Sequence, residues 1–264
     1  MGLFDKKFCS ICGGKIGLLG NRKLEDGNLC KDCAAKLSPW FSERRHSGVE
    51  DIKAQLAYRE ENKAAVSAFH TTRSLGRYTK VLLDEDARKF MVAKTGNITA
   101  ENPDVLDYSQ VTGCDLDIDE NRHELTRKDN EGKSVSYNPP RYEYSYDFYV
   151  NIRVNHPYFD EIRFNLNNGS VNTGERAMGG AASGWHSNTA GVNIRTGVGV
   201  NEYYELVNMG NEIKEALTQA RQEVRDEVAA ANAPKTAVVC PLCGATTIPD
   251  AQGCCEYCGG AIRG

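Results

Sequence analysis

The sequence predicts an α+β protein in which an antiparallel β-sheet domain, closed by a C-terminal helix, is flanked by two small zinc ribbons. Three observations support this fold class. Two Cys-x-x-Cys pairs occur near the start of the chain and two more near its end. Apolar residues alternate with a period of two through the middle, and a long stripe with a helical period follows them.

The 264 residues suit one central domain with small flanking parts, because this length is long for a single domain and short for two large ones. The parts are an N-terminal zinc ribbon (1–46), a connecting helix (47–70), a central sheet and helix domain (71–231) with a glycine-rich loop (167–199), a linker (232–238) and a C-terminal zinc ribbon (239–264). Segments as short as the ribbons bury too little surface to fold alone, and metal binding supplies the missing free energy.

The cysteine pairs have the spacing of metal ligands. A Cys-x-x-Cys turn places two sulfurs on one side of a bend, so two turns supply four thiolates with no open position, which is typical of structural zinc. Seventeen residues separate the two N-terminal pairs and eleven separate the two C-terminal pairs. We therefore predict two structural Zn²⁺ ions, with the ligands Cys9, Cys12, Cys30 and Cys33 in one site and Cys240, Cys243, Cys255 and Cys258 in the other.

Two other interpretations of these cysteines stay open. One is a redox pair, but this requires a surrounding βαβ unit, which the sequence predicts at neither terminus. The other is iron, which four tetrahedral sulfurs bind as well as they bind zinc. Two cysteines lie outside the sites. Cys254 would leave a three-residue gap before Cys258 if it replaced Cys255, and Cys114 is expected to be a small buried residue.

Glycine follows the second cysteine in three of the four turns. These residues are Gly13, Gly244 and Gly259, whereas Ala34 follows Cys33. Glycine adopts a left-handed conformation without steric cost. We expect this conformation to direct amide hydrogens at the sulfurs.

Between the N-terminal pairs, residues 23–29 predict a β-hairpin with Asp26 and Gly27 as a two-residue loop of positive φ. A short helical turn then stops near Pro39. The apolar residues expected to cover the metal site are Leu37, Trp40 and Phe41.

A connecting helix is predicted from about residue 48 to residue 69. Ser47 and Glu50 have the spacing of a capping box at its start. One helix face carries the apolar residues Val49, Ile52, Leu56, Val66 and Phe69. The rest of the helix is largely polar, as expected of a connecting element.

The first 70 residues resemble a known family. The stretch MGLFDKKFCSICGGKIGLLGNRKLEDGNLCKDCAAKLSPWF is similar to the amino-terminal zinc-ribbon domain of a family of bacterial proteins, filed as a domain of unknown function. The resemblance implies a small zinc-binding module on a cytoplasmic bacterial protein. It implies no activity.

The central region predicts an antiparallel sheet with one buried face. The expected strands are residues 77–83, 88–93, 111–118, 142–154 and 162–166, with an acidic turn at 84–86 and a short apolar segment at 105–108. In the longest strand one face carries Tyr142, Tyr144, Tyr146, Phe148, Val150, Ile152 and Val154.

A helix is predicted over about residues 202–230 from the stripe Leu206, Met209, Ile213, Leu217, Ala220 and Val224. A curved sheet closed by one C-terminal helix resembles the pleckstrin-homology type of domain. This resemblance implies a lipid headgroup pocket beside the first hairpin. Because the acidic turn at 84–86 would repel a polyphosphate, we expect protein binding in its place.

The overall charge argues against a protein that mainly neutralises phosphates, since the net charge is −4 and the pI is near 5.8. Residues 1–50 nevertheless carry nine Lys or Arg against six acids, a balance of +3. We find neither an apolar h-region nor a run of apolar residues long enough to span a membrane. We therefore expect a cytoplasmic protein with reduced cysteines and no membrane insertion.

Other candidate sites favour structural explanations. Glu143 and Asp147 interleave the tyrosine face, which favours core packing over stacking of nucleic-acid bases. Asp115, Asp117 and Asp119 imitate the start of a calcium loop that lacks its glycine and its final glutamate. The five histidines show no zincin spacing. We predict no active site and no small-molecule substrate.

These observations favour a non-enzymatic, zinc-binding cytoplasmic adaptor that binds an unidentified protein partner. The alternative is nucleic-acid binding through the N-terminal ribbon, and an unrecognised enzyme comes third. In the glycine-rich loop, Trp185 is a candidate anchor for a partner, against the alternative of an unstructured connection.

Overall fold

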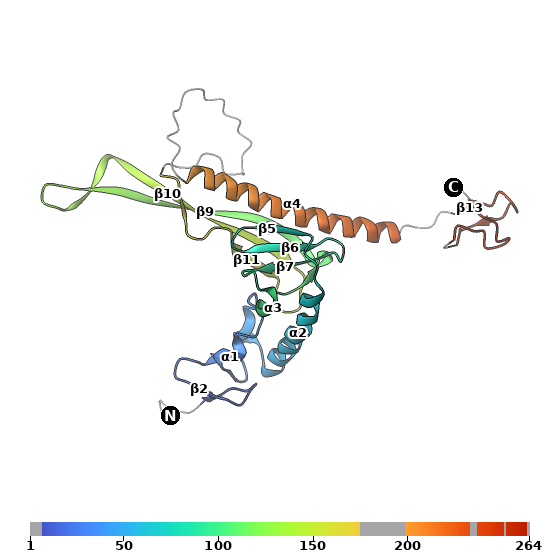
Figure 1. Ribbon diagram of the computed structural model, residues 1–264, viewed down its shortest axis with the longest axis horizontal. Helices are drawn as coiled ribbons and strands as arrows, with labels where there is room; N and C mark the ends of the chain where they lie inside the picture. Colours follow the sequence, from blue (N-terminus) through green and yellow to red (C-terminus); the bar gives the residue numbers. More distant parts are fainter. Residues whose placement is uncertain (1–6, 175–198, 233–236, 251, 263–264) are drawn as a thin grey trace, which may run out of the picture. The chain divides into compact units, whose positions relative to one another are not determined.

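The computed structural model describes residues 7–174, 199–232, 237–250 and 252–262 (Figure 1). The chain divides into two compact units, Met1–Arg221 and Gln222–Gly264. Helices and antiparallel sheets occur together, as the sequence predicts. Most of the glycine-rich loop lies outside the described residues, and with it the candidate anchor Trp185.

The N-terminal ribbon consists of two short hairpins and a single helical turn. One hairpin pairs β1 (Lys7–Phe8) with β2 (Lys15–Ile16), and the other pairs β3 (Arg22–Lys23) with β4 (Asn28–Leu29). The helix α1 (Lys31–Ala34) and the 3-10 helix η1 (Glu43–His46) follow. Their buried cluster contains Cys9, Ile16, Leu24, Leu29, Cys33, Leu37 and Ile52.

The second hairpin differs from its prediction in the turn. Lys23 pairs with Asn28, so the connection has four residues, and Gly27 does not have positive φ. Glycine is required there by close approach, because a Cβ atom would lie 2.6 Å from Ser10 Oγ and 2.7 Å from Val49 Cγ2.

Two of the three residues expected over the metal site pack there. Leu37 belongs to the buried cluster, and Phe41 packs against it. Trp40 is instead covered by Lys94, whose Nζ lies 5.0 Å from the ring centroid. The prediction for Trp40 was wrong, because its ring makes a cation–π contact with Lys94 of the central domain and is not part of the cluster.

The connecting helix is present as α2 (Val49–Ala68), but it begins one residue later than predicted. Gly48 is the N-cap, and its N–H donates to Asp51 Oδ2 at 2.8 Å. The Val49 N–H donates to Asp26 Oδ1 of the hairpin, also at 2.8 Å. Ser47 Oγ turns back and donates to the Glu43 carbonyl at 2.9 Å, so it does not cap the helix.

The first sheet has the order β5-β6-β7-β8, all antiparallel. Its strands are β5 (Arg73–Gly76), β6 (Lys80–Asp84), β7 (Lys89–Ala93) and β8 (Leu106–Asp107). The predicted hairpin is β6–β7, whereas β5 was missed and residues 77–79 form a turn.

Both faces of this sheet are buried along β6 and β7, which contradicts the single buried face that the sequence predicted. Val81, Leu83, Phe90 and Val92 share one face, and Leu82, Met91 and Ala93 share the other. The second face is covered by Phe69, by Val105 and by Ile98 of α3 (Ile98–Glu101).

The second sheet is built around β10 (Ser134–Val154), which pairs with β9 (Val111–Lys128), β11 (Glu161–Asn165) and β12 (Val171–Asn172). The predicted strands 111–118 and 142–154 are the inner parts of β9 and β10. Tyr146 through Val154 alternate as buried residues, as expected, while Tyr142 and Tyr144 are half-buried. Residues 121–144, the distal arm, continue as a two-stranded ribbon (Figure 1).

The helix α4 (Val200–Ala231) follows the sheets, as predicted. It packs on the second sheet through Tyr203, whose ring centroid lies 4.8 Å from that of Tyr146 and 5.2 Å from that of Phe148. Gly210 faces Leu116 of β9, where a Cβ atom would lie 2.5 Å from Leu116 Cδ1. Met209 and Val224 of the predicted stripe are only half-buried.

The second unit contains the C-terminal cysteines. A short hairpin pairs β13 (Val238–Val239) with β14 (Thr246–Thr247), and an isolated bridge joins Cys254 to Ala261. In its described residues only Cys240, Thr247 and Cys255 are buried.

Candidate metal centres

The eight cysteines predicted as ligands form two groups. In each group the four Sγ atoms lie within 4.8 Å of one another. The sulfur pairs Cys12–Cys30, Cys240–Cys258 and Cys243–Cys255 are separated by 3.8, 3.7 and 3.7 Å. Disulfide sulfurs lie about 2.05 Å apart, whereas sulfurs bound tetrahedrally at about 2.3 Å lie about 3.8 Å apart. Both groups can therefore hold a metal ion.

Three of the four Cys-x-x-Cys turns have the same backbone. The first cysteine N–H donates to the carbonyl five residues later, and its carbonyl accepts from the glycine N–H four residues later; all six bonds are 2.8–2.9 Å long. Gly13, Gly244 and Gly259 have φ values of 71°, 72° and 68°. The predicted left-handed glycines are thus confirmed.

The fourth turn, which lacks glycine, is the start of a helix. Cys30 is the N-cap of α1, and its Sγ accepts the Cys33 N–H at 3.3 Å. The Cys30 N–H in turn donates to Cys9 Sγ at 3.3 Å. A helix N-terminus supplies free amide hydrogens and a favourable dipole for a thiolate. In the turn that has no left-handed glycine, the start of the helix therefore directs amide hydrogens at the sulfurs.

Without metal, one sulfur in each group ionises readily. Burial raises the pKa of Cys9. Hydrogen bonds from the backbone N–H groups of Cys12, Cys30 and Ile11 together lower it by more, so that the pKa is about 6. Backbone N–H groups at Cys243 and Leu242 bring the pKa of Cys240 to about 6 in the same way. Since the thiolate is the form that binds metal, each group offers one ligand already ionised near neutral pH.

The two remaining cysteines take different positions. Cys254 Sγ lies 3.9 Å from the Gln252 carbonyl, and it is the Sγ of Cys255 that approaches Cys243. Cys114 is buried on β9, where burial raises the pKa of its thiol to about 12. An un-ionised thiol behaves as a small apolar side chain, as expected for Cys114.

A buried polar cluster surrounds Asp104, and it was not predicted from the sequence. Arg59 Nη1 donates to Asp104 Oδ1 at 2.6 Å, with side chains 7% and 0% exposed. Ser38 Oγ donates to Asp104 Oδ2 at 2.7 Å, and Tyr58 Oη donates to Oδ1 at 3.1 Å. Asn62 Nδ2 donates to the Pro103 carbonyl at 2.7 Å. This cluster ties the ribbon and α2 to the loop before β8.

Two of the three acidic residues that imitate a calcium loop, Asp115 and Asp117, are held in ion pairs. Asp115 Oδ2 lies 2.6 Å from Arg153 Nη2, and Asp115 Oδ1 lies 3.3 Å from Lys214 Nζ. The hydrogen bond from Arg153 lowers the pKa of Asp115. Asp117 pairs with Arg163. Their carboxylates belong to the side-chain network of the second sheet, in agreement with the expectation of an ordinary strand.

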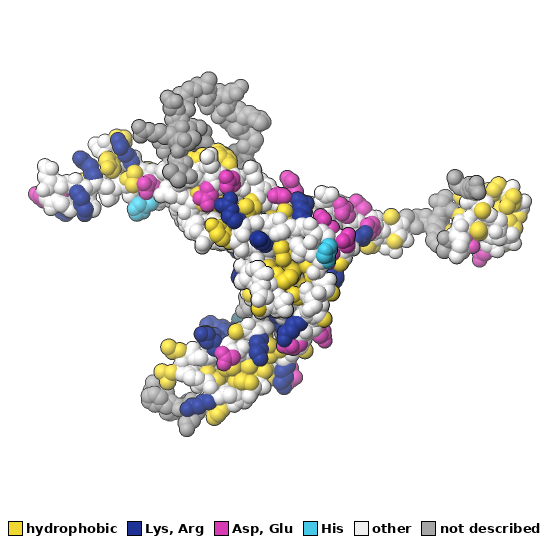
Figure 2. All heavy atoms as spheres, in the orientation of Figure 1, with side chains coloured by type: hydrophobic (Ala, Val, Ile, Leu, Met, Phe, Trp, Pro, Cys, Tyr) yellow, Lys and Arg dark blue, Asp and Glu magenta, His cyan; other side chains and the backbone are white. Residues whose placement is uncertain are grey.

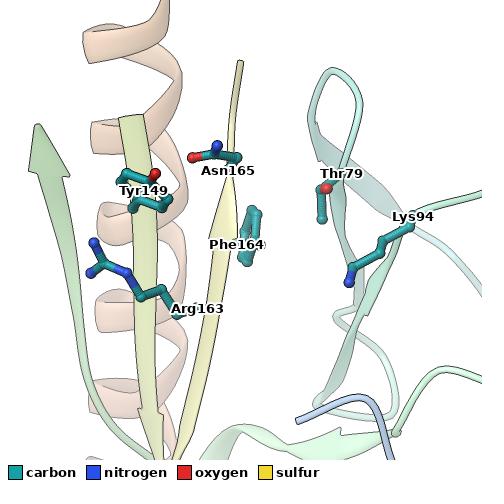
Figure 3. Close-up of a pocket in the computed structure, with 6 residues that line it drawn as sticks. All are labelled: Thr79, Lys94, Tyr149, Arg163, Phe164 and Asn165. Atoms are coloured by element: carbon teal, nitrogen blue, oxygen red, sulfur yellow. The ribbon is translucent and has the colours of Figure 1, made fainter. Parts of the chain in front are cut away.

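A cleft of about 420 Å³ lies between the two sheets and is lined by Thr79, Lys94, Tyr149, Arg163, Phe164 and Asn165. Figure 3 shows Lys94 pointing toward Phe164, whereas Arg163 points away from Lys94. Arg163 is already engaged by Asp117 and by the Tyr149 ring, 4.3 Å from its guanidinium carbon. Lys94 lies over Trp40, so both cations of the cleft have partners within the protein.

A second cleft, of about 480 Å³, lies between residues 41–51 and the loop 156–160. It brings Glu43, Asp51 and Asp160 near the rings of His156 and Tyr158. Burial lowers the pKa of His156, so this imidazole is neutral at neutral pH. Of the four histidines in the described residues, only His156 lines this cleft.

Comparison with known proteins identifies the N-terminal part alone. A family model described as Domain of unknown function (DUF4428) matches residues 7–55, which include the first cysteine group and the start of α2. The chain is similar to that domain over this stretch, in agreement with the resemblance of its sequence. The curated proteins and the solved structures contain no match. Every helix in the described residues is too short or too polar to cross a membrane.

Proposed function

We propose that the protein is a zinc-stabilised cytoplasmic adaptor that binds a protein partner and has no catalytic activity of its own. The observation that carries this proposal is the composition of the two metal groups. Each group supplies four cysteine sulfurs, so a bound ion keeps no position for water or substrate. Such an ion stabilises a fold and presents its surface.

Zinc is the metal we assign to both groups. The sulfur separations of 3.7–3.8 Å agree with Zn–S bonds of about 2.3 Å. Reduced thiols in both groups suit a reducing compartment such as the cytoplasm. Iron suits the same ligands, and elemental analysis of the purified protein separates the two metals.

We assign the central domain to the pleckstrin-homology type. Two antiparallel four-stranded sheets followed by one long helix support this assignment. The turn between β6 and β7 contains Glu85 and Asp86, both exposed, which is unfavourable for a phosphoinositide. We therefore assign the domain to protein binding and not to lipid binding.

The proposal is tested in two steps. Elemental analysis should give two zinc ions per chain, and one for a chain that ends at Ala233. In-cell crosslinking of the full chain should then capture a defined protein that the truncated chain or a Cys9→Ser variant fails to retain. A fully metallated protein that crosslinks to nothing, or that turns over a substrate, would remove the adaptor role.

The alternative, nucleic-acid binding, gains support from the distal arm. Four cations of the arm have no ion-pair partner among the described residues, namely Arg122, Arg127, Lys133 and Arg141, whereas Arg73, Arg77, Arg153 and Arg163 of the domain body are paired. Arg122 lies 4.6 Å from the Tyr142 ring centroid, and Arg141 lies 4.9 Å from that of Tyr137. Unpaired cations beside aromatic rings are typical of single-strand binding surfaces.

Single-stranded RNA and DNA in a mobility-shift assay decide this alternative. If it holds, binding weakens steeply with salt, and Arg122→Ala/Arg141→Ala weakens it while Arg73→Ala/Arg77→Ala does not. The control arginines are paired with Glu212 and Glu205. No shift at low salt would exclude nucleic acid as the partner.

A further inference from the structure

The second sheet has one long edge strand. Within the body of the domain, β9 lines one side of β10, while β11 and β12 line the other side. β9 has 18 residues, whereas the other edge strands of the two sheets, β5, β8, β11 and β12, have two to five. Short strands are a common protection of sheet edges. β9 lacks this protection.

The outer edge of β9 has unused backbone groups. Every second residue of an edge strand directs its N–H and C=O groups away from its neighbour in the sheet. In the part of the chain that the structure describes, the backbone of residues 112–119 is hydrogen-bonded to no backbone other than that of β10. The structure that pairs with such an edge is another extended chain.

The two faces of the sheet beside this edge differ in character. Asp115, Asp117 and Asp119 alternate with Leu116 and Ile118, so the aspartates share one face and the apolar residues share the other. The apolar face is the one on which α4 packs, and both apolar residues are half-buried there. A strand added to this edge would place its own side chains alternately beside the aspartates and beside the apolar residues.

The helix α4 runs along the same sheet (Figure 1). Its Lys214 Nζ lies 3.3 Å from Asp115 Oδ1, so the available part of the edge starts at Leu116. Val207 lies seven residues before Lys214 and therefore on the same helix face. It is half-buried. The helix thus offers a further apolar side chain on the apolar side of the edge.

The charge of β9 beside this edge is negative. Residues 111–121 contain four acids and neither Lys nor Arg. Cations of neighbouring elements pair with two of the acids, since Asp115 contacts Arg153 and Lys214, and Asp117 contacts Arg163. Glu120 Oε2 accepts the Tyr146 hydroxyl at 3.1 Å. The fourth acid, Asp119, is exposed and has no ion-pair partner among the described residues.

Asp119 also lies directly opposite Asp147 of β10, and like charges in this position repel each other. The side chains that donate to the Asp147 carboxylate are the neutral ones of Asn121, Asn167 and Ser170. Arg122, the first cation further along β9, lies on the opposite face, 4.6 Å from the Tyr142 ring centroid. Figure 2 shows Lys and Arg side chains along the visible face of the distal arm, with Asp and Glu side chains where the arm meets the body. A cation beside Asp119 would relieve the repulsion.

We propose that the outer edge of β9, at residues 116–120, pairs with an extended segment of a partner protein in which basic residues alternate with apolar ones. The basic side chains lie beside Asp117 and Asp119, and the apolar side chains lie beside Leu116 and Ile118. A second copy of β9 fits the edge poorly, because its aspartates would lie beside those of the first copy. This inference rests on the proposed adaptor function and names the surface that performs it.

The test uses short labelled peptides and the full-length, zinc-loaded protein, with binding measured by fluorescence anisotropy. A peptide that alternates lysine with valine should bind at least about tenfold more tightly than one that alternates glutamate with valine. It should also bind at least about tenfold more tightly than a peptide in which the same lysines and valines form two blocks.

Backbone pairing has a signature of its own. All residues on one face of a strand direct their N–H groups to the same edge. Two further peptides therefore carry backbone N-methyl groups, one on its lysines and the other on its valines. Because only one of these classes donates to β9, one methylated peptide should bind at least about tenfold more weakly, and the other should bind as the unmethylated peptide does.

Asp119→Lys reverses a charge at the edge without breaking an ion pair of the described residues. It should weaken binding of the lysine peptide at least about tenfold and strengthen binding of the glutamate peptide. The matched control is Glu85→Lys in the turn between β6 and β7, which is equally exposed and should change neither. Thermal melts show whether both variants stay folded.

Four outcomes would overturn the proposal. They are equal binding of the lysine and glutamate peptides, an equal loss for the two methylated peptides, an equal effect of Asp119→Lys and Glu85→Lys, and no binding by the metallated protein. A dimer in sedimentation equilibrium that the lysine peptide dissociates would assign the edge to a second copy and remove the partner segment.

The crosslinking experiment distinguishes this inference from the adaptor function itself. A protein partner that Asp119→Lys still retains, together with no peptide binding, would keep the adaptor function and remove this edge. Binding of the lysine peptide with the methylation signature, together with no captured protein, would keep the edge and remove the adaptor function.

Discussion

Arg59 Nη1 and Asp104 Oδ1 form a buried ion pair of 2.6 Å that joins α2 to the loop before β8. Ser38 of the ribbon completes the carboxylate with a hydrogen bond of 2.7 Å to Oδ2. Three parts that are distant in sequence therefore share one carboxylate. The ribbon and the central domain should consequently unfold together.

Asp104→Leu should destabilise the protein by about 3–5 kcal/mol, because it leaves the Arg59 charge buried without a partner. Replacing both partners, in Arg59→Met/Asp104→Leu, should restore most of this loss, because no charge then stays buried. Urea unfolding followed by circular dichroism measures both effects.

The control for this pair is Asp107→Asn, which breaks the exposed pair Lys89–Asp107 of 2.8 Å. Its cost should stay below about 1 kcal/mol, as for other exposed pairs. If Asp104→Leu cost no more than Asp107→Asn, the buried pair would not couple the ribbon to the domain.

The polar face of α2 shows why part of the fold was not predictable. Gln55, Arg59 and Asn62 lie on the buried face between Ile52 and Val66. In a sequence, polar residues along one helix face predict that this face is exposed to solvent. The partners of Arg59 and Asn62 lie at least 40 residues away, at Asn102–Val105, so no local pattern indicates that these side chains are buried.

Our second prediction is that a chelator removes zinc from the two metal groups at different rates. The N-terminal group shares its buried cluster with Leu24, Leu29 and Ile52, whereas apolar residues around the C-terminal group are exposed. Opening the C-terminal group therefore costs less burial. Zinc release to a metal-indicator dye should show two phases of one ion each.

Cys240→Ser should remove the faster phase, and Cys9→Ser the slower one. The reverse assignment would contradict the role we give to α2 in covering the N-terminal site. A thermal melt of Cys240→Ser should keep the transition of the first unit, because the chain divides at Arg221.

The cysteine chemistry was the predictable part of the site, because it is local. Each Cys-x-x-Cys turn and the glycine that follows it span only five consecutive residues. Gly13, Gly244 and Gly259 have the left-handed φ values expected of them. Gly27 was predicted for the positive φ of a two-residue loop, whereas the structure requires glycine there because Ser10 and Val49 approach it closely. This requirement is tertiary, so the turn was predicted wrongly.

His156 should make stability depend on pH. Burial lowers its pKa below the ordinary value of 6.5, while the charge of Asp104 opposes this shift. The unfolded chain thus binds a proton at a higher pH than the folded protein does. The stability that His156 contributes is fully present above pH 6.5, and it is lost as the pH falls through the pKa of His156 in the folded protein.

The measurement compares urea unfolding of the natural protein and His156→Phe at pH 7.5 and pH 5.5. Phenylalanine keeps the stacking on Phe159, whose centroid lies 4.2 Å away, but has no proton to bind. The variant should lose less stability on acidification than the natural protein. Because metal release affects both proteins alike, an equal loss in the two would exclude His156 as the source.

Gly210 should be required by packing and not by backbone conformation. It lies on the buried face of α4, where alanine would ordinarily favour the helix by about 0.8–1 kcal/mol. A Cβ atom there would meet Leu116 Cδ1 at 2.5 Å and Cδ2 at 2.9 Å, however. Crowding of this kind costs about 1–3 kcal/mol, so Gly210→Ala should destabilise the protein by about 1 kcal/mol.

The sign of the Gly210 effect should reverse when Leu116 is shortened. In a Leu116→Ala background the crowding is gone and only helix propensity remains, so Gly210→Ala should stabilise by about 0.8–1 kcal/mol. A double-mutant cycle by urea unfolding measures this coupling directly. Additive effects of the two substitutions would mean that α4 does not pack on β9 at Leu116, and the contact that places the helix on the second sheet would have to be reassigned.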